Sequence, residues 1–263
     1  MNFLITGDTH RVFTRFDSIK AMPSDTAIII LGDVGLNYTL DKNDYDTKAA
    51  LCRKYPFTFY CVRGNHEARP EDVPTMELVY DEEVDGLVWQ EPDFPRIKYF
   101  TNWGVYTIDG LRTLVIGGAY SIDKYWRLQN GQKWFANEQL NQEERNACWL
   151  KATQLKQFDM VLAHTCPLSL QPTDLFLRGV DQSLVDSSME EWMEQLFRTI
   201  KWKIFMFGHY HADRIEWPHV EQFYTEIEPL QDILYRWNCY DETGELDWWL
   251  PLSPRMKRIV EED

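Results

Sequence analysis

Cysteine, basic residues and long hydrophobic runs are all scarce in this sequence. Its five cysteines are widely spaced and include no CxxC pair, which excludes a disulfide framework and predicts reduced thiols in a cytoplasmic protein. No apolar run approaches the ~18 residues of a membrane-spanning helix, and the N-terminus has no basic region of the kind that begins a signal peptide. We therefore expect a soluble, cytoplasmic protein that does not enter a membrane.

The balance of charge narrows the classes of partner. Lysine and arginine number 27 against 42 aspartate and glutamate residues, which gives a formal net charge of -15. This charge is spread along the chain, so no long nucleic acid is expected as a partner. Hydrophobic residues make up 44% of the 263 residues, which is typical of a globular protein with a full core. An acidic protein can still bind phosphorylated substrates where metal ions reverse the field inside the site.

Five apolar segments are expected to form strands, with helices between them. The strands are residues 3–6, 26–31, 57–62, 160–163 and 204–207. The helices are residues 11–20, 44–55, 137–158 and 186–200. Strands and helices that alternate at this spacing indicate right-handed crossovers and a largely parallel sheet, so the fold class is α/β.

The remaining segments are expected to be less regular. An Asp-Gly pair between residues 103–108 and 111–116 predicts a hairpin. Residues 124–127 are expected to begin a long loop, in which aromatic and basic side chains alternate. Residues 223–225 and 233–235 are expected to form antiparallel strands.

No linker divides the chain, so we expect one domain over residues 1–263. Residues 64–158 would include a long irregular, hairpin and helical insertion region. Residues from about 228 to 263 would form a C-terminal extension.

Polar residues that can bind metals follow each of the five strands. Ligands of parallel α/β sheets bind outside the carboxyl ends of the strands, so these side chains are expected to meet. Five of the six histidines in the chain belong to this set. Imidazole, carboxylate and amide groups without a thiolate favour two divalent ions such as Mn, Fe, Co, Ni or Zn. The residues are Asp8, His10, Asp33, Asn65, His66, His164, His209 and His211.

Taken in order, these motifs resemble those of the calcineurin-like metallophosphoesterases. They are Gly7-Asp8-Thr9-His10, Gly32-Asp33, Gly64-Asn65-His66-Glu67, His164 and Gly208-His209-Tyr210-His211. The resemblance implies a four-layer α-β-β-α sandwich, in which helices flank two mixed sheets and a dinuclear metal site lies at the carboxyl ends of the strands. Manganese is the favoured metal, with Fe, Zn, Ni or Co as alternatives.

The resemblance also implies roles for individual residues. Asp8, His10 and His211 would hold one ion, Asn65, His164 and His209 the other, and Asp33 would bridge them. His66 would give a proton to the leaving oxygen, a step usually worth ~10²- to 10⁴-fold in rate. Arg63 would bind phosphate oxygens through its guanidinium. The alternative for Arg63 is a surface ion pair.

One position departs from the pattern of two subfamilies. The protein phosphatases and diadenosine tetraphosphatases carry an aspartate that supports the catalytic histidine, and Leu36 stands at that position here. Glu67 or another group must therefore orient His66. The substrate cannot be transferred from those subfamilies.

We expect a metal-dependent phosphoesterase that acts on phosphomonoesters, either small molecules such as nucleotides or phosphoproteins. A phosphodiesterase acting on nucleotides or cyclic nucleotides is one alternative, and a non-catalytic metal-binding or partner-binding scaffold is another. Residues 124–127 and Arg178 either recognise the substrate or belong to solvated loops. The sequence does not indicate the oligomeric state.

Overall fold

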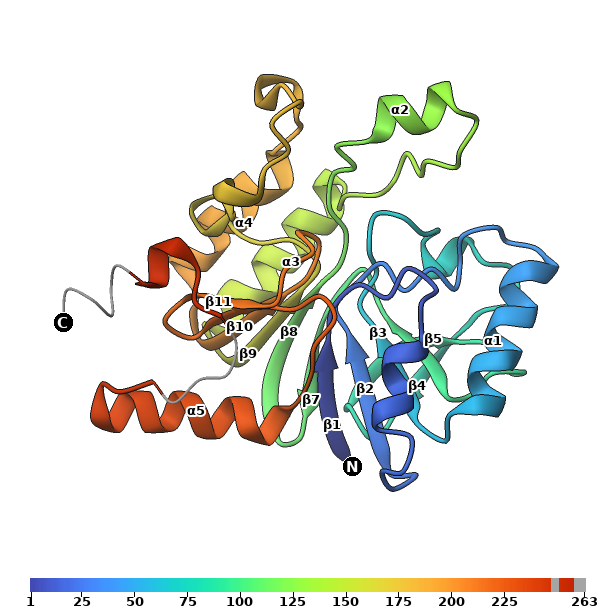
Figure 1. The fold of residues 1–263 in the computed structure, drawn as a ribbon, viewed down its shortest axis with the longest axis horizontal. Coiled ribbons are helices and arrows are strands. Elements are labelled where there is room, and N and C mark those ends of the chain that lie inside the picture. The colour runs from blue at the N-terminus through green and yellow to red at the C-terminus, as the bar shows by residue number, and fades with distance from the viewer. Residues whose placement is uncertain (247–250, 258–263) are drawn as a thin grey trace.

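The computed structural model describes residues 1–246 and 251–257. In this part of the chain, two mixed β-sheets pack face to face and helices cover their outer surfaces (Figure 1). This arrangement is the predicted four-layer α-β-β-α sandwich. No helix in the described residues is long and apolar enough to cross a membrane.

Within the described residues, the first sheet has seven strands in the order β13-β1-β2-β3-β6-β5-β4. The four central strands β1, β2, β3 and β6 run parallel, and antiparallel strands complete both edges. The strands are β1 (Asn2–Thr6), β2 (Thr26–Ile30), β3 (Thr58–Cys61), β4 (Glu77–Asp81), β5 (Gly86–Gln90), β6 (Ile97–Phe100) and β13 (Ile227–Pro229).

The second sheet has six strands among the described residues, in the order β11-β12-β10-β9-β8-β7. Its central strands β12, β10, β9 and β8 run parallel, and β11 and β7 pair antiparallel at the edges. The strands are β7 (Trp103–Ile108), β8 (Leu111–Ile116), β9 (Gln157–Ala163), β10 (Lys201–Phe207), β11 (Arg214–Trp217) and β12 (Val220–Gln222).

The central strands are continuous apolar runs because both of their faces are covered. Successive side chains of a strand point to opposite faces. In β2, Ala27 and Ile29 pack between the two sheets, whereas Ile28 and Ile30 pack under the outer helices. β9 and β10 alternate in the same way. Both sheets are thereby fixed in register, and the carboxyl ends of their parallel strands lie at one end of the sandwich.

The helices cover the outer faces of these sheets. α1 (Lys42–Lys54) and the 3-10 helix η1 (Thr14–Ser18) cover the first sheet, and α3 (Gln142–Leu155) and α4 (Ser188–Thr199) cover the second. α5 (Leu230–Thr243) packs against the edge at β1 and β13. The other helices are short, namely α2 (Lys124–Gln129), η2 (Pro70–Asp72), η3 (Leu168–Leu170), η4 (Thr173–Leu175) and η5 (Gln182–Leu184).

The predicted hairpin is confirmed, since β7 and β8 pair from Trp103 opposite Ile116 to Ile108 opposite Leu111. The helix predicted at 137–158 is shorter, because Asn141 forms a capping box with Glu144 and thus begins α3 at Gln142. Within residues 11–20, only the short helix η1 forms.

Three local predictions are wrong. Residues 124–127 form the first turn of α2 rather than a loop. Residues 233–235 lie in α5, where Leu230, Ile233 and Trp237 have helical spacing and pack into the core between the sheets. Residues 223–225 follow β12 and are not a strand.

Candidate metal centre

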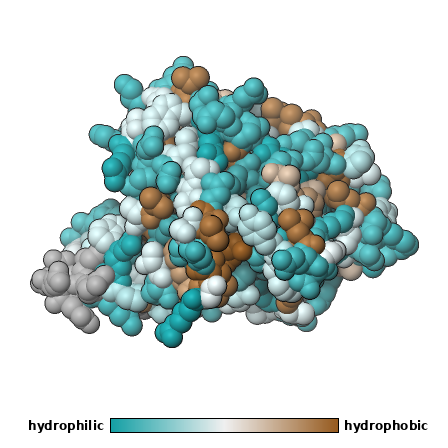
Figure 2. Space-filling model, turned by 90° about the horizontal axis from the view of Figure 1, so that it is seen from above, coloured by the Kyte–Doolittle hydropathy of each residue, from teal (hydrophilic) through white to brown (hydrophobic). Residues whose placement is uncertain are grey.

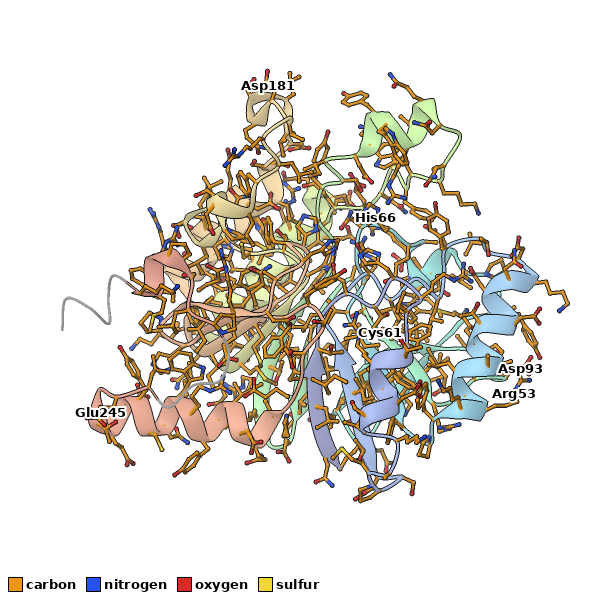
Figure 3. All side chains as sticks on the ribbon, in the orientation of Figure 1. Arg53, Cys61, His66, Asp93, Asp181 and Glu245 are labelled. Atoms are coloured by element: carbon orange, nitrogen blue, oxygen red, sulfur yellow. The ribbon has the colours of Figure 1, made fainter. Side chains whose placement is uncertain are left out.

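The eight residues singled out in the sequence lie together at the carboxyl ends of the parallel strands. They follow β1, β2 and β3 of the first sheet and β9 and β10 of the second, so both sheets contribute. Figure 3 shows His66 above Cys61, the last residue of β3, at the end of the molecule where α2 projects. The sandwich therefore brings together side chains that are up to about two hundred positions apart, such as His10 and His211.

Asp8, His10 and His211 form the first group of possible ligands. The Nε2 atom of His211 lies 3.3 Å from Oδ2 of Asp8, and that of His10 lies 3.8 Å from the same oxygen. This oxygen is buried and has no hydrogen-bond partner among the described residues. A buried carboxylate oxygen without a partner is costly, and a cation would satisfy it. The three residues therefore fit a metal ion.

His164 is at the centre of the second group. Its Nδ1 lies 2.8 Å from the carbonyl oxygen of Leu31, to which it donates a hydrogen bond. The free Nε2 then faces Oδ1 of Asn65 at 2.8 Å and Oδ2 of Asp33 at 3.7 Å. A nitrogen lone pair and two oxygens thus converge, and this donor set also fits a divalent cation.

Asn65 is oriented by a short chain of hydrogen bonds. Its Nδ2 donates to Oγ of Ser121 at 2.8 Å, and Ser121 donates to Oε2 of Glu138 at 2.5 Å. The main-chain N–H of Ser121 and the indole of Trp134 also donate to Glu138. This chain holds the amide of Asn65 with its oxygen toward His164. No local pattern in the sequence indicates it, because Ser121 lies 56 positions from Asn65.

Asp33 lies between the two groups. Its Oδ2 is 3.9 Å from Nε2 of His10 and 3.7 Å from Nε2 of His164. Its Oδ1 accepts a hydrogen bond from the main-chain N–H of His66 at 2.8 Å. Burial disfavours the charged carboxylate, but the neighbouring imidazoles, His164 above all, keep the pKa of Asp33 below its ordinary value. This position is the one that a bridging ligand would need.

Four of the possible ligands have left-handed backbone conformations. The φ angles are 43° at His10, 46° at Asp33, 69° at His209 and 54° at His211. Such conformations are costly for residues other than glycine and are held only where the surrounding structure enforces them. The sharp turns after β1, β2 and β10 thus aim these side chains at one point.

His209 belongs to the same cluster by packing rather than by a close polar contact. Its ring centre lies 5.0 Å from that of His164. Burial, with the neighbouring imidazole of His164, lowers the pKa of His209 to about 3. The ring is therefore neutral near pH 7, which is the form that binds metals.

His66 faces an arginine that the sequence did not single out for this role. Nη2 of Arg127, in α2, lies 3.3 Å from Nε2 of His66. Asp123 holds this guanidinium through Nε at 2.7 Å, which is an i to i+4 ion pair. Burial lowers the pKa of His66, and the charge of Arg127 lowers it further. The spacing of four positions between Asp123 and Arg127 could have indicated this ion pair. The two side chains meet, however, only if the segment is helical, and a loop was expected there.

A family model described as calcineurin-like phosphoesterase matches residues 1–213. The chain belongs to this family. As a calcineurin-like phosphoesterase, the protein is a hydrolase of phosphate esters, and its family depends on a dinuclear metal centre. The predicted family, fold and enzyme class are thus confirmed.

Other comparisons concern the fold alone. No curated protein matches this sequence. Among solved structures, a phosphopantetheinyl hydrolase (PptH) from Mycobacterium tuberculosis is similar at 15% identity and a TM-score of 0.44, over 95% of this chain and 94% of that one. A 5'-nucleotidase precursor from Thermus thermophilus is similar at 15% identity and a TM-score of 0.39, over 83% of this chain and 43% of that one.

Arg63 does not occupy the position predicted for it in this phosphoesterase. Its side chain is fully buried. Nε donates to Oδ1 of Asn102 at 2.9 Å, and Nη1 donates to the carbonyl oxygens of Glu138 at 2.7 Å and Gly64 at 3.1 Å. A guanidinium enclosed in this way ties two loops together and has no open face for a phosphate. The buried position of Arg63 therefore matches neither the expected contact with phosphate nor the alternative of a surface ion pair.

Glu67 likewise supports the turns of this phosphoesterase rather than the ring of His66. Its carboxylate accepts hydrogen bonds from the main-chain N–H groups of Gly64 and Val34 and from the hydroxyl of Tyr99. Among the hydrogen bonds of the described residues, none joins Glu67 to the ring of His66. Leu36, at the position of the missing aspartate, is buried in the core that α1 covers. Arg127 is the group that meets His66 instead.

Proposed function

We propose that this protein hydrolyses phosphomonoesters to an alcohol and inorganic phosphate. The observation that carries the proposal is the pair of Arg127 and His66 beside Asp33. A guanidinium can bind two phosphate oxygens at once, and a monoester offers more unesterified oxygens than a diester. Arg127 thus takes the role first expected of Arg63.

The metal ligands are proposed as the sequence motifs implied them. Asp8, His10 and His211 would hold one ion, Asn65, His164 and His209 the other, and Asp33 would bridge the two. Such ions lower the pKa of a bound water and oppose the charge that builds up on the phosphate. We propose manganese, while nitrogen and oxygen ligands without a thiolate also allow Fe, Zn, Ni or Co.

His66 is proposed to hold the proton that the leaving oxygen takes. Its main-chain N–H donates to Asp33, which keeps the residue beside the proposed bridging carboxylate. In the free protein its Nε2 faces the guanidinium of Arg127 at 3.3 Å. A bound phosphate would draw this guanidinium to its own oxygens, and Nε2 would then be free to carry a proton toward the leaving group.

The proposal is tested with p-nitrophenyl phosphate and bis-p-nitrophenyl phosphate in a panel of divalent metals. We expect kcat/KM for the monoester to exceed that for the diester by about tenfold or more in Mn²⁺. A diester or cyclic nucleotide preferred by about two orders of magnitude would overturn the proposal in favour of a phosphodiesterase.

A pair of arginine variants tests the observation behind it. Arg127→Ala should lower kcat/KM for the monoester by about tenfold or more, because a charged hydrogen bond to the phosphate is lost. Arg53→Ala removes the same charge from an exposed position in the last turn of α1 and should leave both esters unchanged. Equal effects of the two substitutions would show that the charge acts only at long range.

A further inference from the structure

A cavity of about 450 Å³ opens directly beside the metal centre. Five residues of the site line one part of it. The presence of His66 among them is important, because the proposed proton donor must face the leaving oxygen. A leaving alcohol that takes its proton from His66 would therefore lie in this cavity. The five residues are Asp33, Asn65, His66, His209 and His211.

The rest of the cavity wall is largely apolar. It comes from the segment just before α2 and from the loops between β9 and α4, which rise on two sides above the strand ends (Figure 1). Figure 2 looks at the molecule from above and shows hydrophobic side chains set among hydrophilic ones on this face. The apolar lining residues are Tyr120, Ile122, Leu175, Phe176, Leu177 and Val185.

Packing and hydrogen bonds hold this wall in place beside the metal centre. Tyr210 lies between the ligands His209 and His211, and its ring stacks on that of Phe176 with centres 6.3 Å apart and planes 19° apart. Arg214 of β11 donates two hydrogen bonds of 2.8 Å to the carboxylate of Asp174, in η4. The wall therefore exists before any substrate binds, so little ordering opposes binding.

Acidic side chains outnumber basic ones in the cavity lining that the structure describes. Asp123, Asp186 and Glu190 line it, and no lysine or arginine belongs to its lining among the described residues. Asp123 is paired with Arg127, and burial raises the pKa of Glu190 to about 7, so Asp186 is the carboxylate that a leaving group with a carboxylate or further phosphates would meet. An uncharged leaving group would avoid this repulsion and bury its apolar surface.

We propose that this cavity binds the leaving alcohol of a phosphomonoester, and that this alcohol carries an aryl or branched alkyl group without negative charge. The inference rests on the proposed phosphomonoesterase function and narrows its substrate class. Nucleoside di- and triphosphates and acidic phosphopeptides would then be poor substrates, because their leaving groups are anionic.

Three esters of similar alcohols test it, namely ethyl phosphate, 2-phenylethyl phosphate and 2-(4-carboxyphenyl)ethyl phosphate. We expect kcat/KM for the phenylethyl ester to exceed that for the ethyl ester by about 10- to 100-fold, since a phenyl group becomes buried. The carboxylate should remove most of this gain. Equal values for the three esters would overturn the proposal for the cavity and leave the phosphomonoesterase function standing.

Substitutions in the cavity wall test whether the preference for the phenylethyl ester arises there. Phe176→Ala should reduce the ratio of phenylethyl to ethyl kcat/KM by about fivefold or more. Leu177→Lys, at a side chain that is 60% exposed, should shift the preference toward the carboxylate ester. Leu184→Ala is the matched control, because this leucine is exposed on the same loop and lies outside the cavity lining. A ratio unchanged by Phe176→Ala and Leu177→Lys would contradict the proposal.

The two proposals can fail separately. Turnover of diesters alone would contradict the phosphomonoesterase, and the same three comparisons made with the diesters would then decide the proposal for the cavity. If no ester is hydrolysed, the dissociation constants of 2-phenylethylphosphonate and ethylphosphonate decide it, with an expected ratio of about ten or more in favour of the phenylethyl compound.

Discussion

The two halves of the metal centre differ in their exposure to solvent. In one half, the side chains of His164 and Asn65 are almost entirely buried, at 0% and 1% exposure. In the other half, the side chains of His10 and His211 are 33% and 47% exposed. The contrast is carried by these four side chains, since Asp8 is fully buried and His209 is of intermediate exposure.

The two halves also differ in the groups that hold them. His164 donates to a main-chain carbonyl, and Asn65 is held by Ser121 and Glu138. His211 is held by the ring of Tyr224, which stacks on it with centres 4.6 Å and planes 19° apart. Hydrogen bonds fix both the tautomer and the direction of a ligand, whereas stacking fixes only the plane of a ring. The buried half should therefore bind its ion more tightly, and the exposed half should lose its ion first.

Substitution of Asp33 should affect the two halves of the metal centre equally. Because Asp33 is the proposed bridge, Asp33→Ala should remove a ligand from both halves at once. We expect the variant to lose both ions in metal analysis after dialysis and to lose its turnover of p-nitrophenyl phosphate. Asp25→Ala makes the same change at an exposed aspartate before β2 and should retain both. An Asp33→Ala protein with two ions and normal turnover would contradict the assignment of the bridge.

Substitution of His66 should change metal binding in neither half, although His66 adjoins Asn65 in the sequence. We expect His66→Ala to keep both ions and to lose kcat at least about tenfold more on an alkyl phosphate than on p-nitrophenyl phosphate, because a basic alkoxide cannot leave without a proton. Loss of an ion would damage both substrates alike. Equal losses on the two substrates together with a missing ion would instead make His66 a ligand.

The contrast between the halves explains how much the sequence could predict. The ligands follow apolar strands and form ordered motifs, so their meeting at one end of a parallel sheet was predictable from residues near each of them. The solvent exposure of each ligand was not predictable, because it depends on which loops lie over that ligand. His164 is covered by loops from both sheets, and nothing next to it in the sequence indicates this.

The wrong predictions have two different origins. Arg63 stands in a motif position but donates to the carbonyl of Glu138, 75 positions away, so no local pattern could reveal that it is buried. Residues 233–235 have a local β-like composition, yet the positions of Leu230, Ile233 and Trp237 place them on one face of a helix. Over the longer segment 230–237, the helical spacing of these apolar residues indicates the helix.

Ser121 offers a way to weaken the buried half alone. Ser121→Ala removes the hydroxyl that holds the amide of Asn65, so the amide oxygen is no longer kept toward His164. Loss of such an outer partner usually lowers metal affinity by about 10- to 100-fold. We expect a loss of this size for the tighter of the two ions in a competition titration with a chelator. The matched control Ser24→Ala, at an exposed turn, should leave both affinities unchanged.

The smallest effect is expected from Tyr224, and it concerns the exposed half alone. The ring of Tyr224 restricts that of His211, and aromatic pairs contribute about 0.5–1.5 kcal/mol beyond their buried area. Tyr224→Leu should therefore weaken the more loosely bound ion by about two- to tenfold, since a factor of ten corresponds to about 1.4 kcal/mol. Tyr224→Phe keeps the ring and should bind both ions as before. If Tyr224→Leu weakened the tighter ion instead, the ion at His211 would be the better held of the two, and exposure would not determine the order in which the ions are lost.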